Sequence, residues 1–170
     1  MASINYTFRH DYPSQPILDA PHILLLEDSS GEAELLCHTR LVLWEFLESL
    51  SQKAQPWIDV RHSATDALNS MRTQAELEPH NLPMLIVVDL SLPRKNSLSF
   101  LQTLRQDPRL KNLPVIVMAW AEEEEVVRSL YGLGVSAYVI KPVRFADLPA
   151  MAGPLSCNSL LRHSARDSAV

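Results

Sequence analysis

Apolar residues in this chain gather in five short runs, which are separated by longer segments of mixed polarity. The runs are His22 to Leu26, Trp57 to Arg61, Met84 to Val88, Val115 to Ala119 and Ala137 to Ile140. Continuous apolar runs of this length are typical of strands that are buried on both faces of a parallel sheet. The second run alternates instead, with Asp59 and Arg61 on its less apolar side, which predicts a strand at the edge of the sheet.

The segments that follow the first two runs have the spacing of helices. Glu32 and Glu34 suit the first turn of a helix after the turn Ser29 to Gly31, because acidic side chains favour the positive end of the helix dipole. Leucines and Phe46 then recur at helical intervals up to Leu50. A second helix is expected after the second run, capped by Thr65 or Ser63.

Three further helical segments follow the central run. One helix is expected to run from after Asn96 and Ser97 to about Gln106, where Asp107 and Pro108 end it. The acids Glu122 to Glu125 open the next helix, which Gly134 ends. Phe145, Leu148 and Met151 indicate a last helix, which Pro149, Gly153 and Pro154 cut short. Strands that alternate with helices in this way predict an α/β fold with a doubly wound, five-stranded parallel sheet and right-handed crossovers.

The central run leads directly into an acidic residue. Asp89 follows Val88, and a polar turn through Pro93 to Asn96 comes next. Asp89 is therefore expected at the carboxyl end of a buried strand, where ligands and chemistry collect in open α/β sheets. Turns favour aspartate in any case, so this one residue fits a simple loop cap equally well.

Composition limits the size of the protein and its range of partners. The chain has 170 residues, of which 46% are hydrophobic and 21% charged, and this suits one globular domain. We expect a flexible arm over 1–20, a domain over 21–154 and a flexible tail over 155–170. The formal net charge of -5 argues against a nucleic-acid partner, which requires a basic face.

Cysteine and histidine positions give no metal or disulfide framework. Cys37 and Cys157 are far apart, so a reducing compartment is the simplest setting. The six histidines lack the spacing of a zinc site, and each is expected at the surface: His10, His22, His38, His62, His80 and His163. The first residues lack the apolar stretch of a secretion signal, and no run is long enough to span a membrane. These features predict a cytoplasmic protein that does not contact a membrane.

The strand ends bring together residues that suit phosphoryl transfer. Glu27 and Asp28 follow the first strand, Asp89 follows the third, and Lys141 follows the fifth. Carboxylates at one sheet edge repel one another unless a cation lies among them, and Mg²⁺ prefers such oxygen ligands, here with the backbone carbonyl of Ser91. A metal ion and an ammonium group together would neutralise a phosphoryl group arriving on Asp89. Paired carboxylates also serve glycosidases, but the chain offers no aromatic platform for a sugar.

The motifs at these strand ends resemble the receiver domains of two-component response regulators. The matching stretches are ILLLEDS, IVVDLSLPRKN, LPVIVM and AYVIKP, and they cover roughly Pro21 to Pro154 in the same order. The resemblance implies a flavodoxin-like sheet with strand order 2-1-3-4-5 and no enzymatic activity beyond self-dephosphorylation. It also implies a single-domain regulator whose partner is a sensor histidine kinase.

The same resemblance implies a role for each site residue. Glu27, Asp28, Asp89 and the Ser91 carbonyl would hold Mg²⁺. Asp89 would accept the phosphoryl group, Lys141 would pair with it, and Tyr138 would be the aromatic switch. The segment ELEPHNLP and the single-domain layout look like the stand-alone regulators that partner bacterial phytochrome-type kinases.

Departures from the family pattern at three places bear on how the protein works. Ala119 stands where the family has a threonine or serine, so one hydrogen bond to the phosphoryl group is lost and coupling to Tyr138 should be weak. Trp120 stands where a small residue is usual, and we expect it to fill space beside the site and hinder phosphodonor entry. Asn96 and Ser97 lie where the turn usually has glycine, and Asn tolerates a left-handed backbone.

Three functions remain open on the sequence alone. The first is a phosphoacceptor receiver that signals by docking or dimerising through its fourth helix, fifth strand and fifth helix. The second is an interaction or dimerisation module that no longer depends on phosphate, which Ala119 and Trp120 favour. The third is a small metal-dependent phosphohydrolase, which lacks an evident general base beyond Asp89.

Overall fold

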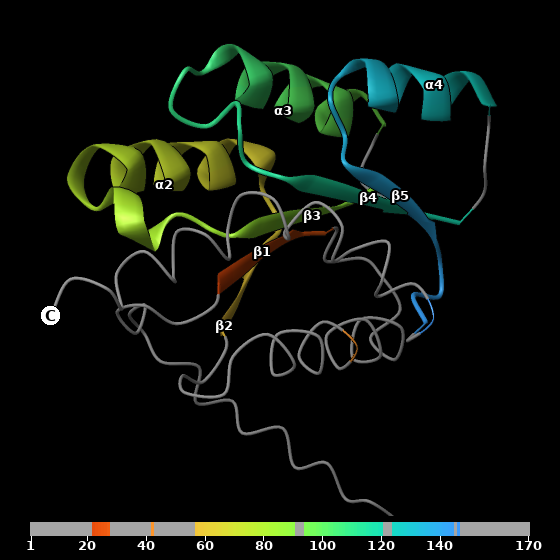
Figure 1. The fold of residues 1–170 in the computed structure, drawn as a ribbon, viewed down its shortest axis with the longest axis horizontal. Helices are drawn as coiled ribbons and strands as arrows, with labels where there is room; N and C mark the ends of the chain where they lie inside the picture. The colour runs from red at the N-terminus through yellow and green to blue at the C-terminus, as the bar shows by residue number, and fades with distance from the viewer. Residues whose placement is uncertain are drawn as a thin grey trace, which may run out of the picture.

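The computed structural model describes residues 22–27, 42, 57–90, 94–120, 124–144 and 146. Within these residues, five parallel strands form one sheet in the order β2-β1-β3-β4-β5 (Figure 1). The strands are β1 (His22–Leu26), β2 (Trp57–Arg61), β3 (Leu85–Asp89), β4 (Val115–Ala119) and β5 (Ala137–Ile140). The doubly wound parallel sheet, its strand order and the edge position of β2 are thereby confirmed. The central strand lies one residue later than the apolar run predicted, because Asp89 itself pairs with Met118 of β4.

The described helices lie together on one face of the sheet (Figure 1). They are α2 (Ala64–Leu77), the short 3-10 helix η1 (Pro79–Asn81), α3 (Arg94–Gln106) and α4 (Glu124–Gly132). Ser63 caps α2, since its side chain accepts a hydrogen bond of 3.2 Å from the Asp66 amide. The prediction that the polar turn continues to Asn96 was wrong, because α3 already begins at Arg94.

Several expected segments lie outside the described residues. They include the arm over 1–20, the tail over 155–170, most of the helix expected from Glu32 to Leu50 and most of the last helix. Val42 is the exception within the first helix. It is helical and fully buried.

Alternate strand residues pack two apolar layers, one on each face of the sheet. On the helical face, strand residues such as Leu24 and Val88 pack with Met71, Phe100 and Leu130 of α2, α3 and α4. On the other face, the buried residues include Ile23, Leu25, Val42, Val87 and Ile116. Burial on both faces explains why the apolar runs are continuous. Because the strands are packed on both faces, their carboxyl ends, which carry the predicted site, are held in fixed positions.

Arg105 links three chain segments at the amino ends of β4 and β5, opposite the carboxyl ends that carry the predicted site. Its guanidinium group donates to four backbone carbonyl oxygens, those of Leu133 at 3.1 Å, Lys111 and Leu113 at 2.9 Å, and Gly134 at 2.8 Å. Burial lowers the pKa of Arg105 from its usual value. Gly134 has a φ of +74°, which favours glycine, and a Cβ there would lie 3.2 Å from Arg105 Nε, so a side chain would also press on the guanidinium group. The expectation that Gly134 ends the fourth helix is confirmed.

His22 corrects the expectation that every histidine lies at the surface. His22 is 6% exposed, and its ring stacks on Trp57 with 4.2 Å between the ring centroids. Its Nδ1 lies 3.2 Å from the carbonyl oxygen of Asn81. Burial lowers the pKa of His22 to about 4, because the low-dielectric interior disfavours the charged imidazolium. His62 and His80 are exposed, as expected.

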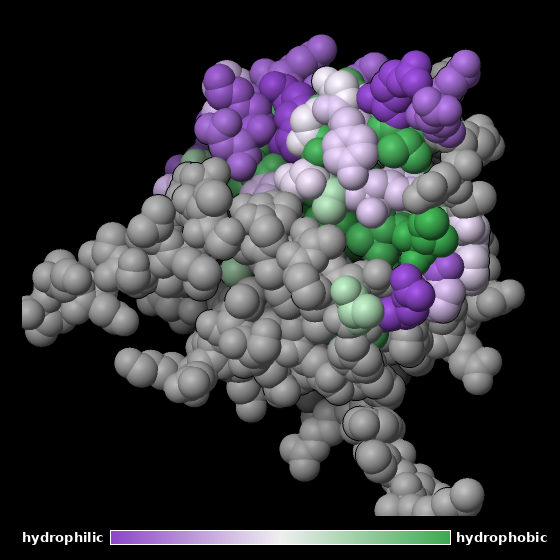
Figure 2. All heavy atoms as spheres, turned by 45° about the vertical axis from the view of Figure 1, so that its right-hand side comes forward, coloured by the Kyte–Doolittle hydropathy of each residue, from purple (hydrophilic) through white to green (hydrophobic). Residues whose placement is uncertain are grey.

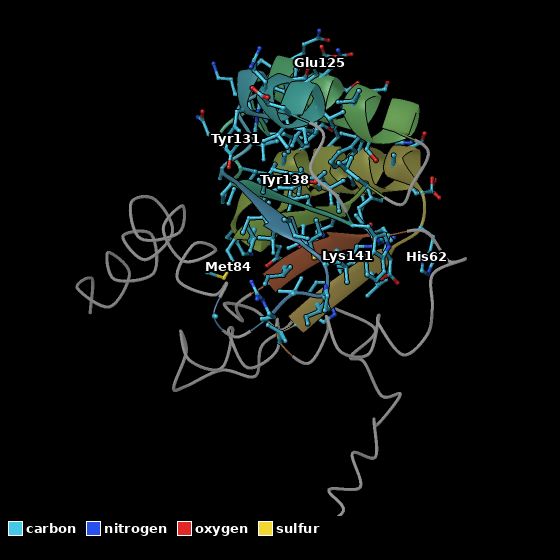
Figure 3. The ribbon with its side chains drawn as sticks, turned by 90° about the vertical axis from the view of Figure 1, so that its right-hand side faces the viewer. His62, Met84, Glu125, Tyr131, Tyr138 and Lys141 are labelled. Atoms are coloured by element: carbon cyan, nitrogen blue, oxygen red, sulfur yellow. The ribbon has the colours of Figure 1, made fainter. Side chains whose placement is uncertain are left out.

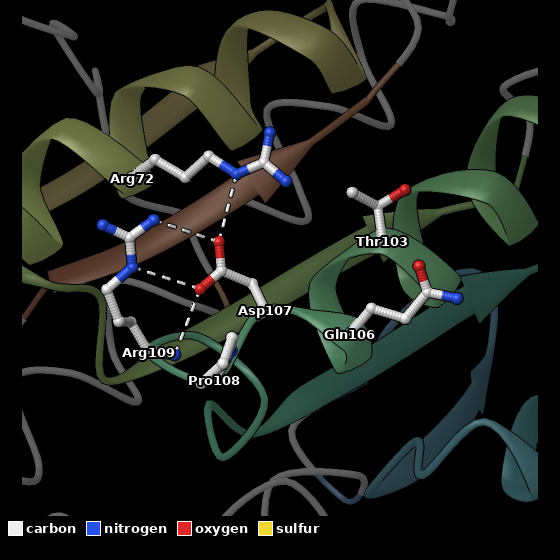
Figure 4. A pocket seen from close by; sticks show the side chains of 6 residues that line it. All are labelled: Arg72, Thr103, Gln106, Asp107, Pro108 and Arg109. Carbon is white, nitrogen blue, oxygen red and sulfur yellow. Dashed lines mark hydrogen bonds and ion pairs between the residues drawn. The ribbon is translucent and has the colours of Figure 1, made fainter.

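A pocket between α2 and the turn after α3 has charged walls that neutralise one another (Figure 4). It is lined by Arg72, Thr103, Gln106, Asp107, Pro108 and Arg109. The Asp107 side chain is 6% exposed and accepts hydrogen bonds from Arg109 Nε at 3.2 Å and Arg72 Nε at 3.1 Å. These guanidinium groups, chiefly that of Arg109, hold the pKa of Asp107 down at about 2. Arg109 also pairs with Glu76 at 2.5 Å, so the arginines are already occupied by carboxylates of the chain.

Substituting Asp107 is expected to destabilise the protein. Asp107→Asn should lower the free energy of unfolding at pH 7 by about 1 to 3 kcal/mol, because charge-assisted hydrogen bonds to two arginines are lost. Since folding lowers the pKa of Asp107 from 3.8 to about 2, its stabilisation is present above pH 3.8 and is lost toward pH 2. The difference between the variant and the wild type should therefore shrink below pH 4. Urea denaturation across this pH range measures it.

Glu76→Gln is the matched control, because Glu76 pairs with the same Arg109 but has a side chain that is 62% exposed. Its loss should be at most about 0.5 kcal/mol, as for other exposed ion pairs. Equal losses for the two variants would contradict the role assigned to Asp107.

Candidate functional site

At the carboxyl edge, backbone hydrogen bonds fix the first residue after β1, β3 and β5. They are Glu27 N to Arg61 O at 3.0 Å, Leu90 N to Met118 O at 2.9 Å and Lys141 N to Ala119 O at 2.8 Å. These bonds extend the strand ladders by one residue. The side chains at the strand ends are thus attached to a rigid backbone.

Asp89 and Lys141 meet at this edge although they lie 52 positions apart in the sequence. Lys141 Nζ donates to Asp89 Oδ2 at 2.5 Å. The side chains of Lys141 and Asp89 are only 3% and 14% exposed. The pair is therefore largely shielded from water, where electrostatic attraction is stronger than at an open surface. In Figure 3, Lys141 lies toward one end of the sheet and Met84, which precedes β3, lies toward the other.

Glu27 occupies the neighbouring position on β1. The register pairs Leu26 with Val88, so Glu27 and Asp89 are the next residues on two adjacent parallel strands. The Glu27 side chain is 7% exposed. Carboxylates on adjacent strand ends repel one another unless a positive group lies among them, and their oxygens are the ligands that Mg²⁺ prefers. The donor chemistry at this edge fits a divalent ion.

Two of the expected metal ligands fall outside the described residues. These are Asp28 and the backbone carbonyl of Ser91. In the part of the chain that the structure describes, no group of three or more acidic, histidine or cysteine side chains is placed to hold a metal. Of the expected metal ligands, the structure describes Glu27 and Asp89.

His62 is a residue that the sequence analysis did not connect with the site. It directly follows β2, and its Nδ1 lies 3.3 Å from the carbonyl oxygen of Glu27 and 4.0 Å from Glu27 Oε1. His62 and Lys141 lie toward the same end of the sheet in Figure 3. The sequence contained a signal for this position, because His62 directly follows the predicted edge strand. The residue after that strand lies at the same carboxyl edge of the sheet as the acidic residues.

The residues at the two switch positions lie on β4 and β5. Ala119 is the last residue of β4 and is 8% exposed, so a methyl group stands where a hydroxyl was expected from the family pattern. Tyr138 on β5 is half-buried and packs against the apolar layer under α2, α3 and α4. Trp120 directly follows Ala119 and is 54% exposed, and the centroid of its ring lies 5.3 Å from Lys141 Nζ.

The fold and the contact between Asp89 and Lys141 fit one protein family, and sequence comparison identifies the same family. The response regulator receiver domain matches residues 39–153, which is more than half of the chain. The chain therefore belongs to the receiver family and is a response regulator receiver of two-component signalling. Receiver domains are phosphoacceptors rather than enzymes, and they bind a divalent metal ion.

Its relatives include a bacteriophytochrome response regulator. Response regulator Rcp1 of Synechocystis sp. is 30% identical over 126 residues, which cover 74% of this chain and 80% of Rcp1. The structure of the bacteriophytochrome response regulator RtBRR is 31% identical with a TM-score of 0.62, over 80% of this chain and 78% of that chain. The Mn²⁺-bound structure of Rcp1 is 30% identical with a TM-score of 0.55, over 83% of this chain and 94% of that chain.

The described helices also bear on the membrane question. None of them combines the length with the apolar character that crossing a membrane would require.

Proposed function

We propose that this chain accepts a phosphoryl group on Asp89 from the phosphohistidine of a phytochrome-type sensor histidine kinase, and signals by protein–protein interaction in the cytoplasm. The observation that carries the proposal is the 2.5 Å contact between Lys141 Nζ and Asp89 Oδ2 at the carboxyl edge of the sheet. The kinase class follows from the similarity to the bacteriophytochrome response regulators RtBRR and AtBRR, which are 31% and 27% identical to this chain.

The proposal assigns Mg²⁺ to the acidic end of β1 and β3. Glu27, Asp28 and Asp89 would supply carboxylate oxygens, and Ser91 a backbone carbonyl. The Mn²⁺-bound form of the relative Rcp1 supports a divalent ion in this family. When bound, the ion neutralises the phosphoryl oxygens that carry charge in the transition state.

The residues of the chain carry out the transfer itself. A carboxylate oxygen of Asp89 bonds to phosphorus, and the bond between phosphorus and the donor nitrogen breaks with its electron pair on the imidazole. Lys141 balances negative charge on the phosphoryl oxygens, because its ammonium already lies against Asp89. β3 and β5 supply these groups from a fixed backbone, so the site needs little rearrangement.

Intact-mass spectrometry tests the proposal. Incubation with acetyl phosphate and Mg²⁺ should add one phosphoryl group to the wild type and none to Asp89→Asn. Asp66→Asn, which changes an exposed acid in the first turn of α2, is the matched control and should gain the group normally. A wild type without a mass gain would overturn the proposal, and steady phosphate release without accumulation would favour a phosphohydrolase.

A second candidate is a receiver-fold module that binds partners or dimerises without phosphate. Ala119 favours it, because no hydroxyl is present there to pull Tyr138 inward after phosphorylation. Apolar surface around α4 and β5, which Figure 2 turns forward, offers an interface, with Tyr131 50% and Ile140 44% exposed. The fifth helix of the expected interface lies outside the described residues. Sedimentation of the wild type and of Ile140→Lys, each with and without phosphorylation, separates the two candidates. The phosphate-independent module predicts the same wild-type dimer in the phosphorylated and unphosphorylated protein.

A further inference from the structure

We propose that Trp120 holds the ammonium group of Lys141 in place and covers the Asp89 site, so that it slows the loss of a phosphoryl group from Asp89. This inference rests on the proposed phosphoacceptor function. It assigns to one side chain of this protein the control of how long the phosphorylated state lasts.

The contact between Trp120 and Lys141 is set by backbone geometry. β4 and β5 are adjacent, with Ala119 opposite Ile140, and the Lys141 amide donates to the Ala119 carbonyl at 2.8 Å. Trp120 and Lys141 are the next residues on these two strands. Lys141 Nζ lies 5.3 Å from the centroid of the Trp120 ring, within the range of a cation–π interaction.

The ammonium group thus contacts two different partners. An ammonium has three N–H donors, and one of those of Lys141 points to Asp89 Oδ2. The electron-rich face of the indole attracts the same positive charge from another side, and this attraction grows as water is excluded. The Lys141 side chain is only 3% exposed although the neighbouring Trp120 is 54% exposed. The Lys141 ammonium therefore meets the indole at a point where little of the lysine is open to water.

This arrangement affects the hydrolysis of aspartyl phosphate. In that reaction a water oxygen bonds to phosphorus, and the bond between phosphorus and the Asp89 oxygen breaks with its electron pair on the carboxylate. The water proton passes to solvent, and inorganic phosphate leaves. A bulky indole beside the site limits the approach of the attacking water.

Three substitutions separate shielding from the cation–π contact. Trp120→Ala removes both the bulk and the π face, Trp120→Leu keeps part of the bulk without a π face, and Trp120→Phe keeps a smaller π face. Leu77→Ala is the matched control, since Leu77 is a large side chain of α2 that is 75% exposed and lies outside the candidate interface. All variants should be compared with the wild type at equal Mg²⁺ concentration.

The first measurement needs no phosphorylation. Lys141 and the exposed Lys111 are acetylated with an N-hydroxysuccinimide ester, and the ratio of their labelling rates is read by peptide mass spectrometry. The ratio should rise about fivefold to tenfold in Trp120→Ala, rise less in Trp120→Leu, and stay close to wild type in Trp120→Phe and Leu77→Ala. An unchanged ratio in Trp120→Ala would show that Trp120 does not cover or hold Lys141.

The second measurement is the half-life of the phosphorylated protein after the donor is removed. It should fall about tenfold in Trp120→Ala, with Trp120→Phe restoring most of the loss. A half-life that is unchanged in Trp120→Ala, or equal in the Phe and Leu variants, overturns the inference. A wild type that gains no phosphoryl group overturns the proposed function instead, and the labelling ratio then still decides whether Trp120 holds Lys141.

Discussion

Replacing Lys141 with methionine is expected to slow the gain of a phosphoryl group by about a hundredfold or more, as found when a preorganised positive or donor group is removed from a transition state. The reason is geometric, because Lys141 Nζ lies 2.5 Å from Asp89 Oδ2 in a site where both side chains are nearly buried. Methionine has a similar length and no charge, so it fills the space without balancing the phosphoryl oxygens. The rate is measured from the intact mass at timed intervals with acetyl phosphate and Mg²⁺.

Lys111→Met provides the matched control, because Lys111 is an exposed lysine in the turn before β4. This variant removes the same charge from the protein as a whole, and its phosphorylation rate should equal that of the wild type. If Lys141→Met were phosphorylated at the wild-type rate, Lys141 would have no role in the transfer. A loss in both variants would indicate an effect of net charge.

Acidification from pH 6.5 to pH 4 is expected to remove about 3 kcal/mol from the free energy of unfolding through His22 alone. The Asn81 carbonyl only accepts hydrogen bonds, so His22 Nδ1 carries the proton and Nε2 is the site that titrates. Within the described part of the chain, the buried Nε2 has no hydrogen-bond partner. A proton placed there would be buried without an acceptor, and the nearby positive charge of Arg61 disfavours it further.

The direction of the pH effect follows from the two pKa values of His22. Its pKa is about 6.5 in the unfolded chain and about 4 in the folded protein, so the unfolded state binds the proton more tightly. The contribution of His22 is therefore complete above pH 6.5 and is lost as the pH falls to 4. Asp107 titrates at lower pH and does not overlap with most of this range.

Denaturant unfolding between pH 7.5 and pH 4 tests this expectation in His22→Phe. Phenylalanine can stack on Trp57 and cannot be protonated, so the stability of the variant should depend much less on pH over this range. His80→Gln changes an exposed histidine and should follow the wild-type curve. Parallel curves for the wild type and His22→Phe would contradict the assignment.

The pattern of apolar runs was sufficient to predict the sheet because its strands are short, continuous and buried. The resemblance implies the strand order, and the parallel strands of that sheet carry Asp89 and Lys141 to the same edge. The start of α3 was missed because Arg94 and Lys95 are polar and look like part of a turn. A helix whose first residues are polar gives no apolar signal there.

Contacts between distant side chains were beyond what the sequence could predict. His22 looked like a surface residue, and its burial depends on Trp57 and Asn81 meeting it from separate segments. Trp120 was expected beside the site, but the ring face it turns to Lys141 depends on the adjacency of two strands. The roles of the expected metal ligands remain predictions, and two of these ligands, Asp28 and Ser91, lie outside the described residues.

The four hydrogen bonds of Arg105 have a mechanical consequence for the receiver. One guanidinium group links the end of α3, the turn before β4 and the turn before β5, so these segments cannot separate without leaving several carbonyl oxygens unsatisfied. That corner acts as an anchor point. Any swing of α4 over the sheet is therefore smallest near Gly134 and largest at its far end, at Glu124.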